Sequence, residues 1–371
     1  MLPIELWENI IEYCQHDTPS LSSCALVCKA WLPKSRQLLF SRHTVELYAS
    51  NTQAFCDLPH TLKFYVAAID LSGHSFTQPN GDQNGDGLIR LSQAVLDECT
   101  NLRSLTLYHA ETVLSLFTRS PITSTLTTLH LRGHVKGPIR RLSVEAGIIL
   151  DLVGNCTVLE DLSMYYRTPR RYISPGDTVE PVDSAAIERK KTTLRFLRKL
   201  DFHLVWSVFM PWFLIPGILR FPSVERLEIS LGYLRQGDQT SLLPLLQPYL
   251  ELFSPSLKEL ILRLDSGWDS IPGKVRLSLL SLGAHWYPPS ALNVSRFKAL
   301  RSFLFRVEGE ILPVHFRTLC DIVRSTREGE SESNPLTVIL TVNNDNETVE
   351  PPDTEGVTWI FDEWYYEDHY K

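Results

Sequence analysis

Residues 99–107 read Cys-Thr-Asn-Leu-Arg-Ser-Leu-Thr-Leu, and residues 156–164 read Cys-Thr-Val-Leu-Glu-Asp-Leu-Ser-Met. In both stretches an amphipathic segment ends at the cysteine, and apolar residues follow with the spacing Leu-x-x-Leu-x-Leu. Helical periodicity that gives way to alternation indicates a helix, a turn and then a strand. We therefore expect the same three-part unit at both places in the chain.

The apolar spacing recurs along most of the chain. When Leu, Ile, Val, Met and Phe are all allowed, about ten such triplets arise by chance in a sequence of this composition. Strict leucine triplets are more informative: there are four, including Leu277/Leu280/Leu282, where roughly one is expected. The regular series, in which each triplet predicts a strand, is Val66/Ile69/Leu71, Leu102/Leu105/Leu107, Leu126/Leu129/Leu131, Leu159/Leu162/Met164, Leu197/Leu200/Phe202, Val224/Leu227/Ile229, Leu257/Leu260/Leu262 and Leu300/Phe303/Phe305.

This series resembles leucine-rich repeats, in which the triplet forms a short strand on the inner wall of a curved solenoid. Successive triplets begin 24 to 43 residues apart, so the resemblance implies a degenerate array with insertions. An alternating run at 336–342 predicts the last strand. Insertions at 73–87 and 168–183 contain proline and glycine and are candidate binding loops. The expected outer helices are the amphipathic stretches at 88–99, 113–117, 144–153, 242–253 and 311–323.

The first forty residues form three helix-sized apolar pieces. In the first, Leu6, Ile10 and Tyr13 share one helix face, and Trp7, Ile11 and Cys14 form a second apolar stripe beside it. Ser20 is a plausible N-cap of the second piece, and the third opens at Leu32-Pro33. Segments below about 40 residues rarely bury enough surface to be stable alone. We therefore expect a docking surface here, the alternative being a helical cap on the core of the remaining chain.

These residues resemble an F-box, the helical module through which substrate receptors join the Skp adaptor of a cullin–RING ubiquitin ligase. The match covers about a tenth of the chain. The resemblance implies that Leu2, Pro3, Leu6, Ile10 and Ile11 face the adaptor. Val27 and Trp31 complete the candidate adaptor-binding set and are expected to help pack the three helices. The matching positions are Leu2, Pro3, Glu5, Leu6, Ile10, Ile11, Leu26, Val27, Cys28, Lys29, Trp31, Ser35, Arg36, Leu39 and Phe40.

The expected fold class is therefore α/β, with a short all-α F-box-like module followed by an irregular leucine-rich-repeat-like solenoid of horseshoe form. The predicted domains are the module at 1–45, the solenoid at 60–345 and an acidic, aromatic tail at 346–371. Acidic groups among aromatic residues suit a segment that docks on a basic, apolar surface such as the Lys- and Arg-rich stretch at 132–199; a solvated tail is the alternative.

Charge and composition limit the classes of partner. A formal net charge of −7 argues against nucleic acid as a partner, because phosphate contacts need a basic surface. Seven cysteines without paired spacing suit reduced thiols in the cytoplasm or nucleus, and no signal peptide is apparent. The uncharged stretch 204–219 is interrupted by Pro211, Pro216 and Gly217, so we expect a buried helix or an exposed aromatic platform and no membrane span.

Metal and catalytic motifs are incomplete. Asp82, Asn84 and Asp86 copy the first half of a calcium loop, but Gln93 occupies the position that needs a bidentate Glu, so we expect a turn. Cys14, Cys24, Cys28 and His16 are close in sequence, yet the cysteines fall on apolar helix faces, which argues against zinc.

No nucleophile elbow, phosphate loop, dinucleotide fingerprint or metalloprotease helix occurs. Histidines near the strands, His109, His130, His134 and His203, are expected to be hydrogen-bonded surface residues.

Together these features predict a non-catalytic receptor without cofactors. Its F-box-like module would bind a Skp-type adaptor, and through it a cullin–RING ligase, while the repeat region would bind a protein substrate for ubiquitin-dependent degradation. The alternative is a leucine-rich-repeat interaction scaffold that does not act through a ubiquitin ligase. The substrate, and any need for phosphorylation or a small co-ligand, stay open.

Overall fold

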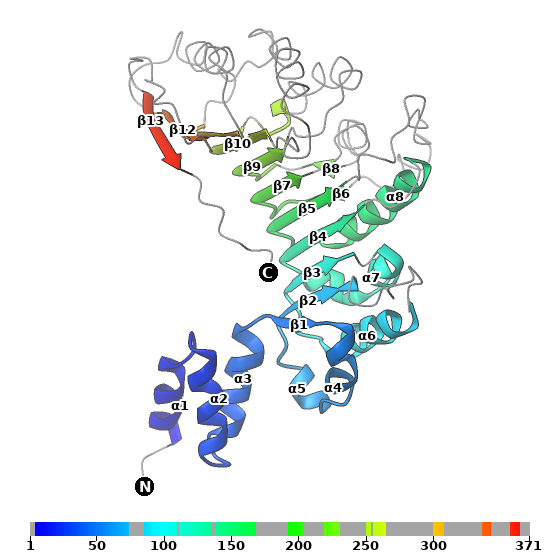
Figure 1. The fold of residues 1–371 in the computed structure, drawn as a ribbon, viewed down its shortest axis with the longest axis vertical. Coiled ribbons are helices and arrows are strands. Elements are labelled where there is room, and N and C mark those ends of the chain that lie inside the picture. Colours follow the sequence, from blue (N-terminus) through cyan, green and yellow to red (C-terminus); the bar gives the residue numbers. More distant parts are fainter. Residues whose placement is uncertain are drawn as a thin grey trace, which may run out of the picture. The chain divides into compact units, whose positions relative to one another are not determined.

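The computed structural model describes residues 4–73, 85–109, 111–134, 139–167, 192–203, 219–220, 222–230, 250–253, 255–264, 300–307, 336–342 and 357–363. These residues form a mixed α/β structure with parallel strands and several helices (Figure 1). The chain divides into two compact units. The first comprises Met1–Gly137 and Val144–Leu162, and the second comprises Pro138–Ser143 and Ser163–Lys371.

The first unit begins with three helices and continues with strands that alternate with helical segments. Its strands pair in parallel in chain order, β1-β2-β3-β4. Helices α6 and α7 lie on the same side of these strands (Figure 1). The elements are α1 (Ile4–Tyr13), α2 (Thr18–Val27), α3 (Leu32–Arg42), β1 (Val45–Leu47), η1 (Ala49–Asn51), α4 (Thr52–Cys56), α5 (His60–Lys63), β2 (Ala68–Ser72), α6 (Gly85–Glu98), β3 (Ser104–Tyr108), η3 (Glu111–Val113), α7 (Leu114–Thr118), η4 (Pro121–Thr125), β4 (Thr128–His134) and most of α8 (Ile139–Asn155).

The division between the two units falls within strand β5 (Asp161–Arg167). In the second unit the paired strands are again parallel, in the order β7-β9-β10-β11-β12-β13, and β6 and β8 form a separate pair. The strands are β6 (Thr192–Thr193), β7 (Lys199–His203), β8 (Leu219–Arg220), β9 (Arg226–Ser230), β10 (Glu259–Leu264), β11 (Ser302–Val307), β12 (Leu336–Val342) and β13 (Val357–Glu363).

The strand prediction is confirmed at all eight apolar triplets, whose second and third residues lie in β2, β3, β4, β5, β7, β9, β10 and β11. The first residue of each triplet, from Val66 to Leu300, is buried just before the strand. The registers keep these positions in line. Ile69 pairs with Leu105 and Leu105 with Leu129 in the first unit, and Leu227 pairs with Leu260 in the second. The aligned apolar side chains thus form one buried face on the paired strands of each unit.

A repeated backbone contact sets this register. The amides of Arg103 and Ser104 both donate to the Ala67 carbonyl, at 2.8 and 2.9 Å, and the amides of Thr127 and Thr128 donate to the Arg103 carbonyl in the same way. The second unit repeats the contact at each step from Arg198 to Lys258. At each step the amides of two consecutive residues donate to one carbonyl just before the preceding strand. Successive strands therefore start at equivalent positions.

The expected helices are found where the structure describes them. Leu88, Leu91 and Val95 recur at helical spacing and are buried, which explains α6. Segment 113–117 covers the end of η3 and most of α7, and segment 144–153 lies within α8. Outside the described residues lie 242–249, 311–323, the Leu277 triplet, loop 168–183 and the calcium-loop residues Asp82 and Asn84, together with nearly all of 204–219.

Four of the described strands were not predicted: the two-residue strands β6 and β8, and the longer β1 and β13. β1 pairs with β2, and β13 pairs with β12 from Leu336↔Val357 to Val342↔Glu363. β13 therefore lies inside the stretch that the sequence division assigned to the acidic tail. Its apolar residues alternate within an acidic composition, so the composition concealed a strand.

Helix α2 begins earlier than the sequence suggests. Asp17, and not Ser20, is the N-cap: the Asp17 carboxylate accepts hydrogen bonds from the Ser20 amide at 3.4 Å and from the Ser20 hydroxyl. The expectation for Ser20 was wrong because proline is tolerated in the first turn of a helix, so Pro19 follows the helix start instead of preceding it.

Asp17→Ala is expected to destabilise the α1–α3 region by about 1 kcal/mol, because it removes the acceptor for an end amide of α2. Asp17→Asn is the matched control and should cost only a few tenths of that, since asparagine also caps helices. Urea denaturation followed by circular dichroism measures both. A larger loss for Asn than for Ala would contradict this assignment.

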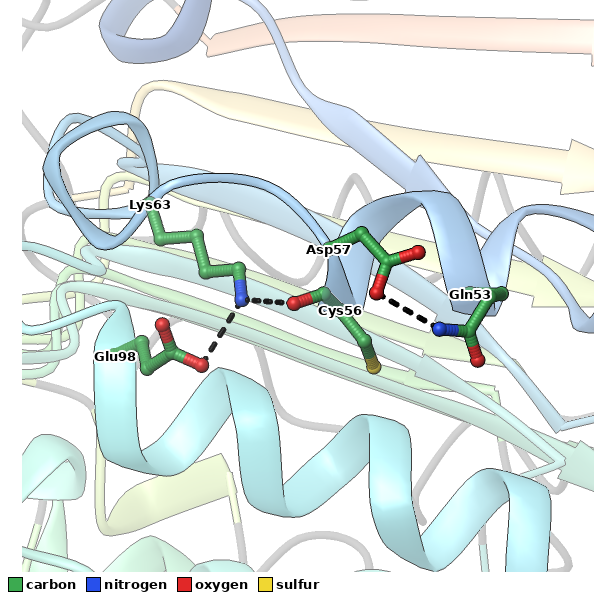
Figure 2. Close-up of polar contacts among 5 residues, drawn as sticks. All are labelled: Gln53, Cys56, Asp57, Lys63 and Glu98. Carbon is green, nitrogen blue, oxygen red and sulfur yellow. Dashed lines mark hydrogen bonds and ion pairs between the residues drawn. The ribbon is translucent and has the colours of Figure 1, made fainter.

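A buried ion pair joins α5 to α6. The Lys63 ammonium group donates to Glu98 Oε1 at 2.9 Å and to the Cys56 carbonyl at 2.8 Å, as Figure 2 shows. The same group lies 5.5 Å from the centre of the Phe55 ring. The Lys63 side chain is 1% exposed and that of Glu98 is 30% exposed. Every contact of this ammonium group is thus internal to the first unit, which makes it a structural feature.

Within the described segments, none of the helices combines the length and the apolar character needed to cross a bilayer.

Candidate docking surface

Helices α1, α2 and α3 share a small core. Ile11, Leu21 and Leu38 are buried together, one from each helix. Four half-buried residues pack around them: Cys14, Cys24, Trp31 and Leu39. A core of this size buries little apolar surface, so much of the apolar character of these helices is left outside it.

Further contacts hold the three helices in place. The Trp7 and Trp31 rings lie with their centres 5.0 Å apart at an interplanar angle of 49°, which joins α1 to the start of α3. Lys34 on α3 forms an ion pair with Glu12 on α1. The Thr18 hydroxyl lies 3.1 Å from His43 Nδ1, which ties the start of α2 to the end of α3. The helices therefore present a defined outer surface.

Among the described side chains of α1 to α3, five large apolar ones are exposed, and we call them the exposed apolar set: Leu6, Ile10 and Tyr13 on α1, and Leu26 and Val27 at the end of α2. Tyr13 is 91% exposed, Leu26 87% and Val27 61%. Leu6, Ile10 and Tyr13 are four and three residues apart, so they lie on one face of α1. Exposed apolar groups gathered on so short a segment are typical of an interaction site.

The structure divides the candidate adaptor-binding residues into two groups. Leu6 and Ile10 are exposed, so they are available to a partner, and Trp31 packs on the core, as expected. Two expectations were wrong. Ile11 is buried, because it is one residue beyond Ile10 and turns about 100° inward to meet α2 and α3. Val27 is exposed, because it is the last residue of α2 and lies beyond the shared core.

Leu2 and Pro3 lie outside the described residues. Two members of the exposed apolar set were missing from the candidate list. Tyr13 follows Leu6 and Ile10 on the same face of α1, so helical spacing was the signal for it. Leu26 precedes Val27 directly, and two adjacent apolar residues cannot both face one small core from a helix, which was the signal there.

A second surface is polar and lies on the strands of the first unit. Glu46, Asp70, Thr106 and His130 occupy one cross-strand row on β1 to β4, between the buried apolar rows. His130 Nε2 lies 3.7 Å from Asp161 Oδ1. This row can offer hydrogen bonds and charge to a partner.

Two tyrosines and an arginine border the row. The Tyr48 hydroxyl donates to Glu46, and this bond, with burial and the nearby charges of Glu46 and Asp70, raises the pKa of Tyr48 to about 12. The Arg132 guanidinium lies 5.2 Å from the centre of the Tyr108 ring and donates to its hydroxyl at 3.2 Å. These groups are polar and aromatic, a composition that suits contact with a protein segment.

Of the histidines considered in the sequence, His130 lies beside Asp161 of the neighbouring strand, whereas His109 directly follows β3 and has a φ of 49°. Among the described residues, no group of three or more His, Cys, Asp or Glu side chains is arranged to hold a metal ion. Burial raises the pKa of both the Cys99 and the Cys156 thiol to about 12, so these two thiols are poor nucleophiles.

No protein-family model matches the chain, and no curated protein aligns with it significantly.

Proposed function

We propose that this chain is the substrate-recognition subunit of a Skp–cullin–F-box ubiquitin ligase. Helices α1 to α3 act as an F-box-like module that binds a Skp-type adaptor, and the strands that follow form a leucine-rich-repeat-like solenoid that binds a protein substrate. The complex acts in the cytoplasm or nucleus. The observation that carries the proposal is the exposed apolar set on a three-helix module with a core of only a few residues.

The chemistry of the exposed apolar set favours a protein partner. Leu6, Ile10 and Leu26 are aliphatic, and each buried methylene of such a side chain contributes about 0.8 kcal/mol when it leaves water. Tyr13 adds a large ring with a polar end, a residue type common at binding hot spots. A Skp-type adaptor that covers these side chains would complete the burial that the small core leaves unfinished.

The repeat-like region supports the receptor half of the proposal. Strands β1 to β4 share one register, with apolar rows buried and a polar row between them, so each of these four strands adds a polar side chain to a common face. Glu46, Asp70 and His130 in this row carry ionisable groups, and Tyr48 and Arg132 lie beside it. A substrate would be recognised there by hydrogen bonds and charge.

In this function the chain performs no bond-making chemistry. It holds the substrate near the charged conjugating enzyme that the adaptor and cullin bring, and so raises the effective concentration of substrate lysines at the ubiquitin donor.

The test compares two matched double variants in binding to a purified Skp-type adaptor. Leu6→Asp/Ile10→Asp should weaken binding about a hundredfold or more, since two carboxylates would be desolvated in an apolar interface. Ile89→Asp/Leu252→Asp is the control. The control residues match the tested ones in exposure. Ile89 is 43% exposed and Ile10 44%, and Leu252 is 49% exposed and Leu6 45%. The control should bind like the wild type, because its residues lie outside α1 to α3.

Circular dichroism should show equal folding of both variants, and isothermal calorimetry should report the affinities. Wild-type protein that fails to bind the adaptor while remaining folded would overturn the ligase proposal and favour an interaction scaffold outside the ubiquitin system. Equal weakening by both variants would show that the exposed apolar set is not the contact.

A further inference from the structure

One face of strands β1 to β4 carries polar and aromatic side chains in two neighbouring rows. Successive side chains of a strand point to opposite faces, so the residues between the buried apolar positions share this face. Glu46 and Asp70 are cross-strand partners in the first row. In the second row Ser72 is aligned with Tyr108, and Tyr108 with Arg132. The two carboxylates are therefore direct neighbours, and aromatic and basic groups lie beside them.

Tyr48 continues the second row at β1. It directly follows the buried Leu47 and keeps an extended backbone, so its side chain returns to the face that carries Glu46. Leu47 is aligned with Leu71, which places Tyr48 level with Ser72. We call the following five residues the acidic tyrosine face: Glu46, Tyr48, Asp70, Ser72 and Tyr108.

The same strands already hold one cation against an aromatic ring. The Arg132 guanidinium lies 5.2 Å from the centre of the Tyr108 ring and donates to the Tyr108 hydroxyl at 3.2 Å. Tyr48 is 39% exposed in the same row, and the carboxylates of Glu46 and Asp70 lie beside it. A guanidinium from a partner would meet an aromatic ring and two carboxylates together there, and these are the groups that bind arginine best.

Glu46 and Tyr48 are held in position by the fold. The Asn51 side chain accepts a hydrogen bond from the Tyr48 amide at 2.7 Å and donates one to the Glu46 carbonyl at 2.8 Å. The Tyr48 hydroxyl donates to Glu46 Oε2. A carboxylate has about four acceptor positions, so Glu46 keeps the capacity to bind a guanidinium as well. Because the groups are already ordered, a ligand loses little binding energy in fixing them.

The charge state of these groups suits a cation. The hydrogen bond to Glu46, then burial, and then the charges of Glu46 and Asp70 raise the pKa of Tyr48 to about 12. The Tyr48 hydroxyl therefore stays protonated at neutral pH and keeps its bond to Glu46. The influence of Asp70 on this hydroxyl agrees with the strand register, which brings both carboxylates next to the Tyr48 position.

We propose that the acidic tyrosine face binds an arginine side chain from an extended segment of a partner protein. The guanidinium donates to the carboxylates of Glu46 and Asp70 and lies against the Tyr48 ring. Lysine fits less well, because its ammonium group is a compact charge without a flat surface. An acidic or phosphorylated segment is disfavoured, because it would meet two charges of its own sign.

This inference deepens the proposed function, since it names the class of substrate as a protein with an arginine in an extended segment. Only the statement that this partner becomes ubiquitinated rests on the proposed function. Arginine binding needs neither the adaptor nor the exposed apolar set, and adaptor binding does not need the acidic tyrosine face. The two proposals can therefore fail separately.

The test uses the purified full chain and a library of nine-residue peptides. The fifth position is fixed as each amino acid in turn, and the other positions are randomised. Wild-type protein should capture the arginine pool about fivefold or more above the mean of the other pools, with lysine below arginine. In the best-bound peptide, citrulline in place of this arginine should weaken binding about tenfold or more by isothermal calorimetry, because the charge is lost while the shape is kept.

Two matched double variants locate the contact. Glu46→Gln/Asp70→Asn removes two charges from the acidic tyrosine face and should weaken the selected peptide about tenfold or more. Asp57→Asn/Asp97→Asn is the control, because it removes two charges from the same unit outside this face. Each of these two carboxylates accepts a hydrogen bond from a glutamine four residues earlier, at 2.8 and 2.9 Å. The control should bind within about twofold of the wild type, and circular dichroism compares the folding of both variants.

Equal binding of the arginine and citrulline peptides, or a preference for acidic pools, would overturn the proposal in the wild type alone, whether or not a variant folds. Equal weakening by both double variants would overturn it as well, since net charge and not this face would then attract the peptide. A chain that binds the adaptor but selects no peptide would refute arginine binding and leave the proposed function standing.

Discussion

Gly73→Ala is expected to lower the free energy of unfolding of the first unit by about 3 kcal/mol or more. Gly73 follows β2, and an added Cβ atom would lie 2.1 Å from the His109 carbonyl oxygen and 2.7 Å from the His109 carbonyl carbon. Both contacts are with backbone, so no side-chain rotation can relieve them. The His109 amide donates to the Arg132 carbonyl at 2.7 Å, which ties this backbone to β4.

Gly147→Ala is the matched control and should have the opposite sign. Gly147 lies within α8, and an added Cβ atom there meets nothing within 4 Å. Alanine should therefore stabilise α8 by about 0.5 to 1 kcal/mol, because glycine is the poorer helix former. Urea denaturation of both variants gives the two free energies. A Gly73→Ala protein as stable as the wild type would show that the backbones of Gly73 and His109 do not approach each other this closely.

Glu98→Ala is expected to destabilise the first unit by about 3 kcal/mol. The substitution removes the carboxylate from a Lys63 ammonium group that is almost wholly buried, and an uncompensated buried charge is costly. The Cys56 carbonyl still accepts a hydrogen bond from the ammonium group (Figure 2), and the Phe55 ring still lies near it, so some stabilisation is retained.

Lys63→Met should cost less, about 1 to 2 kcal/mol, because it removes the buried charge and keeps most of the side-chain volume. The double variant Lys63→Met/Glu98→Ala should then be close to Lys63→Met alone, since the carboxylate has lost its partner. A double-mutant cycle by denaturation measures this coupling. Additive losses in the cycle would mean that the two side chains do not interact in solution.

Lys63 lies between the three N-terminal helices and β2, whereas Gly73 directly follows β2. Ala67 donates from its amide to the Phe40 carbonyl at 3.2 Å, so the end of α3 is joined to the segment before β2 by backbone as well as by side chains. Substitutions at Gly73 or Lys63 are therefore expected to reduce the amount of folded protein before they change the position of the exposed apolar set.

The strands were predictable because their signal is local. Leu105 and Leu227 are buried because apolar residues recur two positions apart along a strand and so share one face, and the same short pattern returns at each predicted strand. β1 and β13 escaped prediction for the same reason. β1 is only three residues long, and β13 lies among acidic residues, so neither displays the triplet.

The candidate docking surface was predictable only in part. Helical spacing correctly indicated that α1 has two apolar faces, but it does not state which of them meets the other helices. Ile10 and Ile11 are chemically identical neighbours, yet one is exposed and the other is buried. Val27 and Leu21 in α2 differ in the same way.

Short-range periodicity was thus sufficient to indicate which residues form strands and helices, because backbone geometry repeats every two or 3.6 residues and imposes that repeat on the side chains. Which apolar face becomes core and which carboxylate pairs with Lys63 depend on residues far apart in the chain. Those outcomes follow from the packing of three helices around Ile11, Leu21 and Leu38 and of α5 against α6, and packing is a property of the folded chain as a whole.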